Sequence, residues 1–322
     1  RENEIPLSKV YGAPWEYVTI KRDKKENNRL VDVYGEFERD DMPKNYDWHG
    51  ITIPLNSDGN ILALAFSDSI TIKKIDEDFF NSFPKLMKIN AYREKVPVLD
   101  LKNLLFLEKA SFSGCQIEKI TNLNNLPLLK EIDLSYNRIA KLENISHLPS
   151  LKKLDLSMND YIEKIEGLDT LSSLEYLDLS NGKWRGRISK IEGLDNLTNL
   201  KKLRITDHPI SKLEGLDNLR LLEILSIVRT KIRKIEGLDK LTNLKHLALT
   251  AIYDSKWGTE KTELKMSGLD NLKKLEFLFL AENNIKKIGG LNGLNNLRII
   301  NLSGNSIEDF SGLNEAVNLE KV

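Results

Sequence analysis

The sequence contains one cysteine, Cys115, in 322 residues. A single thiol excludes an intrachain disulfide and any zinc site built from several cysteines. Chains without disulfides are typical of a reducing compartment, so we expect a cytoplasmic protein. A secreted or surface location stays open, because the chain does not begin with methionine and its natural N-terminus is expected to lie upstream of Arg1.

Long apolar runs and an excess of charge are also missing. No stretch of 18 apolar residues occurs, so no segment is predicted to cross a membrane as a helix. Lys plus Arg and Asp plus Glu number 48 each. A balanced chain has no general attraction for nucleic acid or an anionic membrane, so any charged recognition must be local.

Sequence patterns typical of catalysis, metal binding and cofactor binding are absent as well. The chain has neither a phosphate-binding G-x-x-x-x-G-K-[ST] loop nor a G-x-S-x-G nucleophile elbow. Its four histidines, among them His208 and His246, lack the spacing of metal ligands. We therefore expect no enzyme, no metal and no cofactor.

An internal repeat dominates the rest of the sequence. The pattern L-x-x-L-x-L-x-x-N-x-I-x-x-I-x-x-L-x-x-L recurs mostly every 22 residues, and two weaker copies begin at Ile61 and Leu86. The regular copies begin at Leu107, Leu129, Leu151, Leu174, Leu200, Leu222, Leu244, Leu275, Leu297 and Leu319. The pattern predicts a solenoid over 61–322, with about eleven turns and an incomplete last turn.

Each part of the repeat has a structural task. The L-x-x-L-x-L phrase predicts a short strand with its leucines pointing inward, and strands of successive turns pair in parallel. The Asn at position nine satisfies backbone groups where the chain leaves the strand, and we expect Cys115 and His208 to replace it in their turns. Apolar residues at every third position of the return path favour 3₁₀-like turns, with glycines such as Gly193 and Gly215 easing the bend.

The phrases "IDLSYNRIAKLENISHLPSL" at 132–151 and "KIEGLDNLTNLKKL" at 190–203 resemble the 22-residue class of leucine-rich repeats. This class includes the leucine-rich regulatory subunit of protein phosphatase 1 and bacterial internalins. The resemblance covers about 260 residues. It implies an α/β-type arc with a parallel sheet on its concave face, short 3₁₀ or irregular convex segments and protein binding on the concave surface.

The ends depart from the repeat. Residues 1–60 contain two β-rich stretches, 15–21 and 29–37, which predict a β-hairpin within a segment that caps the first turn. At the other end the chain stops within a repeat, so we expect the natural protein to continue beyond Val322. Two inserts after the strands carry Trp184 and Trp257. These side chains either cover their own loops or form a pair of aromatic contacts for a partner.

The register also predicts which side chains face the concave side. The middle turns present Asp133, Asp155 and Asp178 with Tyr176, followed by the basic residues Arg204 and Arg229. The acidic series is either a routine decoration of the repeat or a patch for a basic partner. The later turns present an apolar group with an adjacent histidine, namely Ile224, Val228, Phe277, Phe279, Ile299 and His246.

An apolar group of this size on a concave surface indicates a binding site, unless a downstream segment of the same chain packs there. We therefore expect a non-catalytic scaffold that binds a protein partner on its concave face. Two alternatives remain: a regulatory or sensor module of a larger enzyme, GTPase or phosphatase system, and a secreted or surface adhesin of internalin type.

Overall fold

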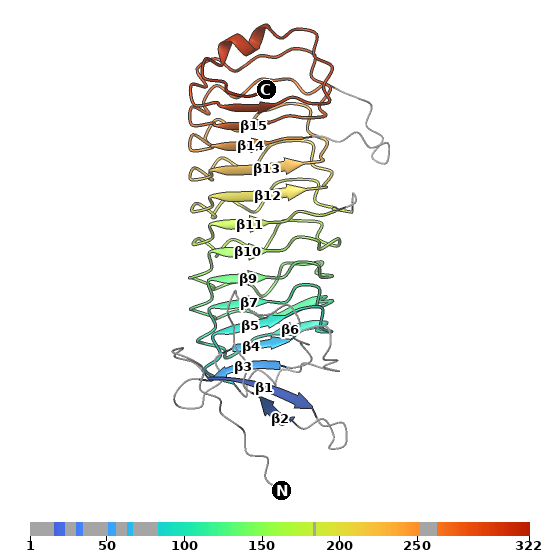
Figure 1. The fold of residues 1–322 in the computed structure, drawn as a ribbon, viewed down its shortest axis with the longest axis vertical. Helices are drawn as coiled ribbons and strands as arrows, with labels where there is room; N and C mark the ends of the chain where they lie inside the picture. The colour runs from blue at the N-terminus through green and yellow to red at the C-terminus, as the bar shows by residue number, and fades with distance from the viewer. Residues whose placement is uncertain are drawn as a thin grey trace.

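The computed structural model describes residues 83–182, 185–250 and 263–322, and the backbone of four strands before them. One 14-stranded sheet runs the length of the molecule in the order β16-β15-β14-β13-β12-β11-β10-β9-β7-β5-β4-β3-β1-β2 (Figure 1). Its strands are β1 (Glu16–Arg22), β2 (Leu30–Tyr34), β3 (Ile51–Leu55), β4 (Ala63–Phe66), β5 (Lys88–Ala91), β7 (Lys109–Ser111), β9 (Glu131–Asp133), β10 (Lys153–Asp155), β11 (Tyr176–Asp178), β12 (Lys202–Thr206), β13 (Ile224–Val228), β14 (His246–Ala248), β15 (Phe277–Phe279) and β16 (Ile299–Asn301).

The sheet from β4 to β16 is parallel, and each strand is the first part of one repeat. Leu154 on β10 pairs with Leu177 on β11, and Leu177 pairs with Leu203 on β12, so equivalent residues lie side by side. These inward leucines are at most 1% exposed. A single hydrophobic core follows from this stacking, and it extends from Leu86 to Ala316. The predicted solenoid and its register are confirmed.

Position nine satisfies backbone groups as predicted. The side-chain carbonyl of Asn137 accepts the amide N–H of Ile117 in the previous turn at 3.0 Å. Its NH₂ group donates to the carbonyls of Phe112, Leu134 and Ser135 at 2.8 to 3.0 Å. Asn159 repeats this arrangement one turn later. In these turns a buried side-chain amide therefore links the turn to the previous turn where the strand ladder stops.

The return path consists of tight turns. The amide of Leu197 donates to the carbonyl of Leu194 at 3.0 Å, and Leu200 donates to Leu197 at 2.9 Å. These bonds span three residues, as in a 3₁₀ helix, and they match the three-residue apolar spacing. The last turn contains a 3₁₀ helix, η2 (Ser311–Glu315). The predicted 3₁₀-like convex side is confirmed.

The N-terminal flank is rich in β-structure. Strands β1 and β2 pair antiparallel, β1 also pairs antiparallel with β3, and β3 joins the repeat sheet through an antiparallel pair between Thr52 and Ala65 on β4. The division at residue 60 and the capping role stay predictions.

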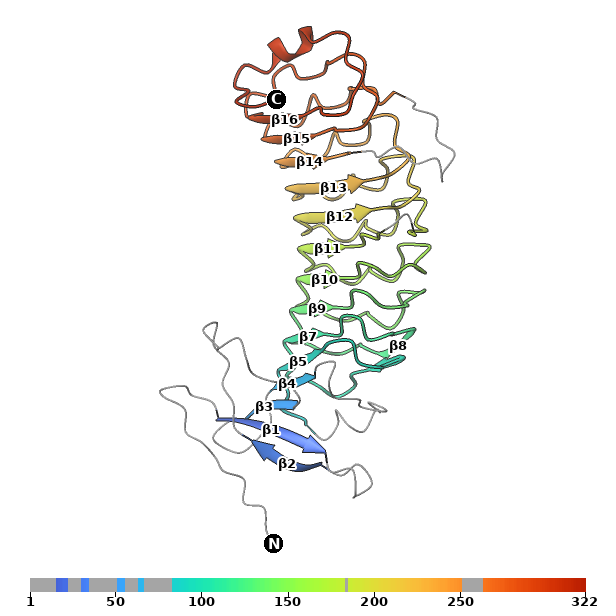
Figure 2. The same cartoon turned by 45° about the vertical axis from the view of Figure 1, so that its right-hand side comes forward.

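On the convex side, β6 (Val98–Asp100) and β8 (Lys119–Asn122) form a second, two-stranded parallel sheet (Figure 2). The sequence analysis expected short 3₁₀ or irregular segments on the convex side and no strands.

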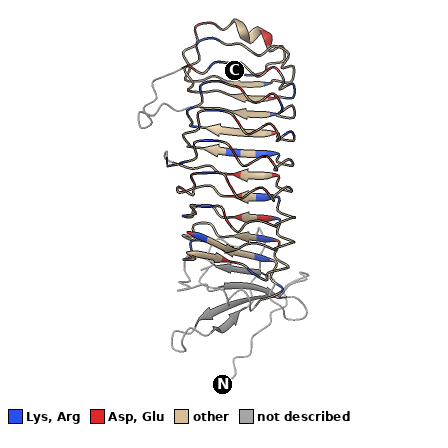
Figure 3. Ribbon diagram, turned by 180° about the vertical axis from the view of Figure 1, so that it is seen from behind, with Lys and Arg blue, Asp and Glu red and all other residues tan. Residues whose placement is uncertain are grey.

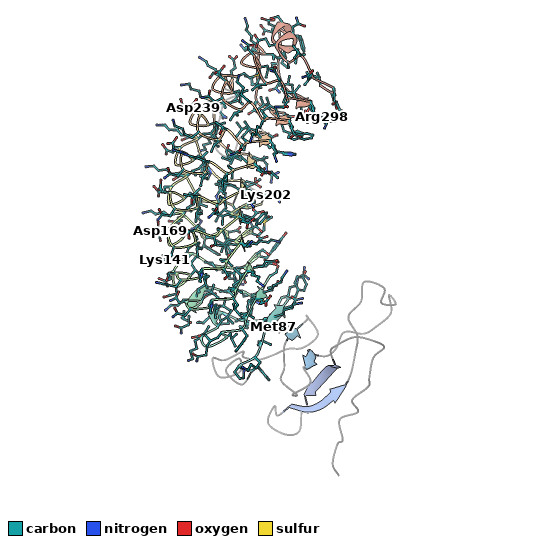
Figure 4. All side chains as sticks on the ribbon, turned by 90° about the vertical axis from the view of Figure 1, so that its left-hand side faces the viewer. Met87, Lys141, Asp169, Lys202, Asp239 and Arg298 are labelled. Atoms are coloured by element: carbon teal, nitrogen blue, oxygen red, sulfur yellow. The ribbon has the colours of Figure 1, made fainter. Side chains whose placement is uncertain are left out.

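The stacked turns form an arc. In Figure 4, Lys202 and Arg298 lie on the inner, concave side, whereas Lys141, Asp169 and Asp239 lie on the outer side. The strands occupy the inner side because they pack about 4.8 Å apart, whereas the bulkier return turns force a wider spacing behind them. The solvent-facing side chains of the sheet therefore line the hollow of the arc.

Candidate partner-binding surface

Two columns of side chains line the concave face between β7 and β16. The strand register places equivalent residues of successive turns beside one another. Column A contains Lys109, Glu131, Lys153, Tyr176, Lys202, Ile224, His246, Phe277 and Ile299. Column B contains Ser111, Asp133, Asp155, Asp178, Arg204, Ser226, Ala248, Phe279 and Asn301.

The four C-terminal strands carry a continuous surface without charged side chains. We call it the apolar block, and it consists of Ile224, Ser226, Val228, His246, Ala248, Phe277, Phe279, Ile299 and Asn301. All of these residues are partly exposed. The rings of His246 and Phe277 stack with centroids 4.4 Å apart and planes 14° apart. Figure 3 shows β13 to β16 without the Lys, Arg, Asp and Glu colours that mark several earlier strands.

The middle of the arc is built around Tyr176. The ammonium groups of Lys153 and Lys202 lie 5.3 Å and 5.2 Å from the centroid of its ring, on the two neighbouring strands. Its hydroxyl donates to Asp178 at 3.0 Å, and a guanidinium nitrogen of Arg204 lies 3.5 Å from the same carboxylate. Burial, together with the charge of Asp178, raises the pKa of Tyr176 to about 12. Tyr176 therefore stays neutral and holds the middle of the surface in place.

The acidic series has a local structural task. Asp133, Asp155 and Asp178 each accept the amide N–H of the residue two positions later, at 2.9 to 3.0 Å. Asn301 accepts the equivalent N–H of Ser303 at 3.0 Å. Burial, followed by repulsion from Asp178 and Asp133, raises the pKa of Asp155. These contacts favour the interpretation that the three aspartates are a routine feature of the repeat, rather than a patch for a basic partner.

Two residues expected to meet a partner are engaged within the chain. Asp178 is only 4% exposed, because its carboxylate is enclosed by Tyr176 and Arg204. Arg229 donates through Nε to Asp207 at 2.6 Å and through a second nitrogen to the other carboxylate oxygen. Asp207 is fully buried, so this ion pair holds Arg229 at the rim. The sequence analysis missed Asp207, although Arg229 occupies the equivalent position in the next turn.

The structure describes only some of the residues in the two inserts. Trp184 and Trp257 lie outside the described residues, so their predicted roles stay predictions. The residues directly after Trp184 return to the body of the arc, where Arg185 pairs with Asp160 at 3.3 Å and Arg187 pairs with Glu163 at 3.1 Å. The amide of Gly186 donates to the carbonyl of Asp207 at 3.2 Å.

The buried thiol and the buried imidazole both replace the position-nine asparagine. Cys115 donates from Sγ to the carbonyl of Ala91 at 3.2 Å, and burial raises its pKa to about 11. His208 accepts the amide of Ile188 at Nδ1 (3.1 Å) and donates from Nε2 to the carbonyl of Leu179 (2.7 Å). Neither group is poised for catalysis at neutral pH, since one is protonated and the other uses both nitrogens structurally.

The described residues contain neither a metal-binding cluster nor a membrane-spanning helix. No group of three or more His, Cys, Asp or Glu side chains in 83–182, 185–250 and 263–322 has an arrangement that fits a metal ion. Within the same part of the chain, no helix has the length and apolar character needed to cross a bilayer.

Comparison with known structures finds the same architecture. Internalin InlF of Listeria monocytogenes superposes with a TM-score of 0.52 at 25% identity, with 76% of each chain covered. The functional domain of InlJ from Listeria monocytogenes gives a TM-score of 0.57 at 19% identity and covers 83% of this chain and 59% of that chain. The InlJ domain includes a cysteine ladder, which a chain with one cysteine does not form.

A third structure, the complex of TLR13 with ssRNA13, gives a TM-score of 0.62 at 22% identity. It covers 76% of this chain but only 36% of the TLR13 chain. The likenesses to InlJ and TLR13 concern the fold alone. A comparison with curated protein sequences finds no significant match.

A family model for the leucine-rich repeat region matches residues 107–320, which is more than half of the chain. These residues contain all the regular copies of the repeat and the parallel strands from β7 to β16. The chain therefore belongs to the leucine-rich-repeat family.

Proposed function

We propose that this protein is a non-catalytic scaffold that binds a protein partner on its concave face, with the apolar block at the centre of the interface. The observation that carries the proposal is the continuity of the block across β13 to β16. Four neighbouring turns lack a charged side chain in both concave columns, although charged residues make up 30% of the sequence. Soluble proteins seldom keep such a surface without a partner.

The size and chemistry of the block fit the centre of a protein interface. Four strands at about 4.8 Å spacing give a length of about 15 Å, and the four-residue step from Ile224 to Val228 adds a width of about 13 Å. The rings of His246 and Phe277 stack on each other, and this contact limits the conformational freedom of both side chains. Rigid, half-buried aromatic groups lose little conformational entropy on binding and are frequent interface hot spots.

The charged middle turns support partner orientation. Lys153 and Lys202 have no carboxylate within ion-pair distance among the described residues, so their charges are offered to solvent around Tyr176. Asp133 and Asp155 offer the opposite sign in the adjacent column. A surface with both signs at fixed places favours one orientation of a partner and rejects others more than it adds affinity.

The test removes the aromatic anchors. A photo-crosslinking amino acid at position 277 in the full chain, used in an extract of the source organism, first identifies a partner. The variant Phe277→Ala with Phe279→Ala is then expected to weaken binding of that purified partner by about 30-fold or more, which corresponds to about 2 kcal/mol.

The matched control is Leu128→Ala with Leu221→Ala, which removes exposed apolar side chains outside columns A and B. It should leave affinity unchanged. Melting temperatures of both variants should stay near that of the unaltered protein. Unchanged affinity of the Phe277 and Phe279 variant, with its fold intact, would place the interface elsewhere. Displacement of the crosslink by a downstream segment of the same chain would make the block an internal contact.

A second candidate function is that of a surface adhesin of internalin type, and the likeness to InlF favours it. The scaffold and the adhesin differ in where the protein works rather than in how the arc binds. Fractionation of source cells with an antibody against the arc separates them. Signal in the cytoplasmic fraction favours the scaffold, whereas protease-accessible signal on intact cells favours the adhesin.

A further inference from the structure

We propose that the segment of the partner that occupies the apolar block is an amphipathic α-helix, which lies along the long axis of the arc and carries carboxylates near both ends. This inference rests on the proposed function and specifies the kind of partner. Two features carry it: the state of the backbone groups beneath the block, and the placement of cations at its two ends.

The backbone amides beneath the apolar block are already hydrogen-bonded within the arc, so they cannot pair with an extended peptide. The amide N–H groups of Ile224, His246 and Phe277 donate to carbonyls of the previous turn at 3.0 Å, and that of Ile299 does so at 3.1 Å. The strands therefore satisfy one another, and the face of the sheet presents side chains alone. An extended segment laid on apolar side chains would lose water from its own backbone without gaining partners. A helix satisfies its backbone internally.

The sides of the block suit the width of a helix. At β13 its width of about 13 Å is close to the diameter of about 10–12 Å of a helix with its side chains, and on the other three strands columns A and B supply a strip about 7 Å wide beneath the helix. Along one side, Lys245 pairs with Glu223 at 2.9 Å. Along the other side, Arg229 pairs with Asp207. These pairs neutralise much of the charge on the sides, whereas Glu276 on the first side and Glu282 on the second have no ion pair among the described residues and leave the sides slightly acidic. The sides therefore offer no attraction for carboxylates of a partner.

The ends of the block differ from its sides. At the β12 end, Lys202 lies beside Ile224 and Arg204 beside Ser226. At the other end, Lys321 lies beside Ile299 in the continuation of column A. Lys202 and Lys321 have no ion-pair partner in the part of the chain that the structure describes, and Arg204 has one long ion pair there, at 3.5 Å from Asp178. Cations at both ends of an uncharged surface complement a segment with an apolar centre and acidic ends.

The spacing of the end cations sets the length of the helix. Five steps between neighbouring strands separate Lys202 from Lys321, which gives about 24 Å at 4.8 Å a step. A helix rises 1.5 Å per residue, so about 16 residues span this distance. The expected segment is therefore a helix of four to five turns with apolar residues at i, i+4, i+7 and i+11.

Three labelled 18-residue peptides with blocked termini test this inference by fluorescence anisotropy with the full chain. The first is an amphipathic helix with two Glu at each end. The second carries Lys in place of those Glu, and the third keeps the Glu but has a central Pro. We expect the first peptide to bind at least about tenfold more tightly than either of the others. Equal binding of the Lys-ended peptide or of the Pro peptide would overturn the inference, and so would no detectable binding of the first.

Charge reversal locates the contact. Lys202→Glu with Lys321→Glu should weaken the Glu-ended peptide at least about tenfold and strengthen the Lys-ended peptide. The control pair Lys212→Glu with Lys240→Glu makes the same change in net charge at exposed positions of the return path and should leave both affinities unchanged. Lys202→Gln with Lys321→Gln should give intermediate values, and this pair replaces the reversal if the reversed variant folds poorly.

Failure of the inference is distinguishable from failure of the proposed function. If Phe277→Ala with Phe279→Ala weakens the crosslinked partner but no peptide prefers a helical, acidic-ended form, only the inference is wrong. If the same variant leaves partner binding unchanged, the proposed function is wrong. Sedimentation of the free protein tests another occupant, because a dimer that dissociates in this variant would make a second copy of the chain the ligand and overturn the inference.

Discussion

At the scale of single residues, His208 shows how a ring replaces an amide. An asparagine at this position offers one acceptor and one donor to the previous turn, as Asn137 does. A neutral imidazole with its proton on Nε2 offers the same pair, accepting from Ile188 and donating to Leu179. A protonated ring has two donors and no acceptor, so it would leave the Ile188 amide without its partner. Burial lowers the pKa of His208 to about 4.

This shift makes the stability of the protein depend on pH. The unfolded chain takes up a proton at His208 near pH 6.5, whereas the folded chain resists protonation until about pH 4. Stability should therefore fall as the pH drops from 6.5 to 4, by up to about 3 kcal/mol from this group. His208→Asn should remove this contribution. Urea unfolding of both proteins at pH 7 and pH 4.5 measures it, and a difference between the two that does not change with pH would contradict the assignment.

The sequence predicted residue roles well where one repeat position has one task. Position nine is such a position, and the inert Cys115 and structural His208 followed from it. Residues whose environment depends on side chains of a neighbouring turn were harder to predict. Asp178 was expected in solvent, but Tyr176 and Arg204 enclose it. The paired state of Arg229 depends on the buried Asp207, and no pattern within a single repeat indicates such a pair.

At the scale of structural elements, the tight return turn depends on its glycine. Gly215 has φ +69°, and a Cβ built there would lie 2.3 Å from the carbonyl oxygen of Ile191 in the previous turn. We expect Gly215→Ala to destabilise the protein by about 2 kcal/mol or more, because left-handed φ costs alanine about 1 kcal/mol and the contact forces a backbone shift.

Gly289 provides the matched control within the same chain. A Cβ at Gly289 would meet no atom within 4 Å, and its φ lies outside the left-handed range. Gly289→Ala should therefore be neutral or slightly stabilising, since alanine lowers the entropy of the unfolded chain. Urea midpoints of the two variants decide the matter, and equal midpoints would show that the turn adapts to a side chain.

A ladder of ion pairs links the elements along one edge of the sheet. The residue before column A alternates in sign over several turns, so that Glu175 pairs with Lys201 at 2.8 Å, Glu223 with Lys245 at 2.9 Å and Arg298 with Glu320 at 2.7 Å. Exposed pairs of this kind contribute little stability each. Their alternation instead favours pairing of each turn with its own neighbour, because a turn that paired out of order would often bring like charges together.

At the scale of the whole molecule, the fold is nearly one-dimensional, since each turn contacts mainly the turns before and after it. The sequence therefore predicted the arc, the parallel sheet and the register, because one period repeated many times carries that information. The two-stranded sheet of β6 and β8 was not predicted, since it appears on the convex side of two early turns only. Departures from the period depend on local packing, which a consensus pattern does not contain.

One-dimensional stacking also makes the ends of the arc vulnerable, and this leads to a prediction for the N-terminal flank. Strand β3 pairs with β4, the first strand of the parallel series, and β1 and β2 continue the sheet beyond it. Removing residues 1–60 should leave the edge of β4 unpaired and the first apolar turn open to water. We expect the shortened protein to self-associate and melt at a lower temperature, as measured by sedimentation and circular dichroism. Removal of residues 1–15 alone, which leaves β1 to β3 in place, should have little effect. A monomeric 61–322 fragment with an unchanged melting temperature would show that the arc needs no cap at this end.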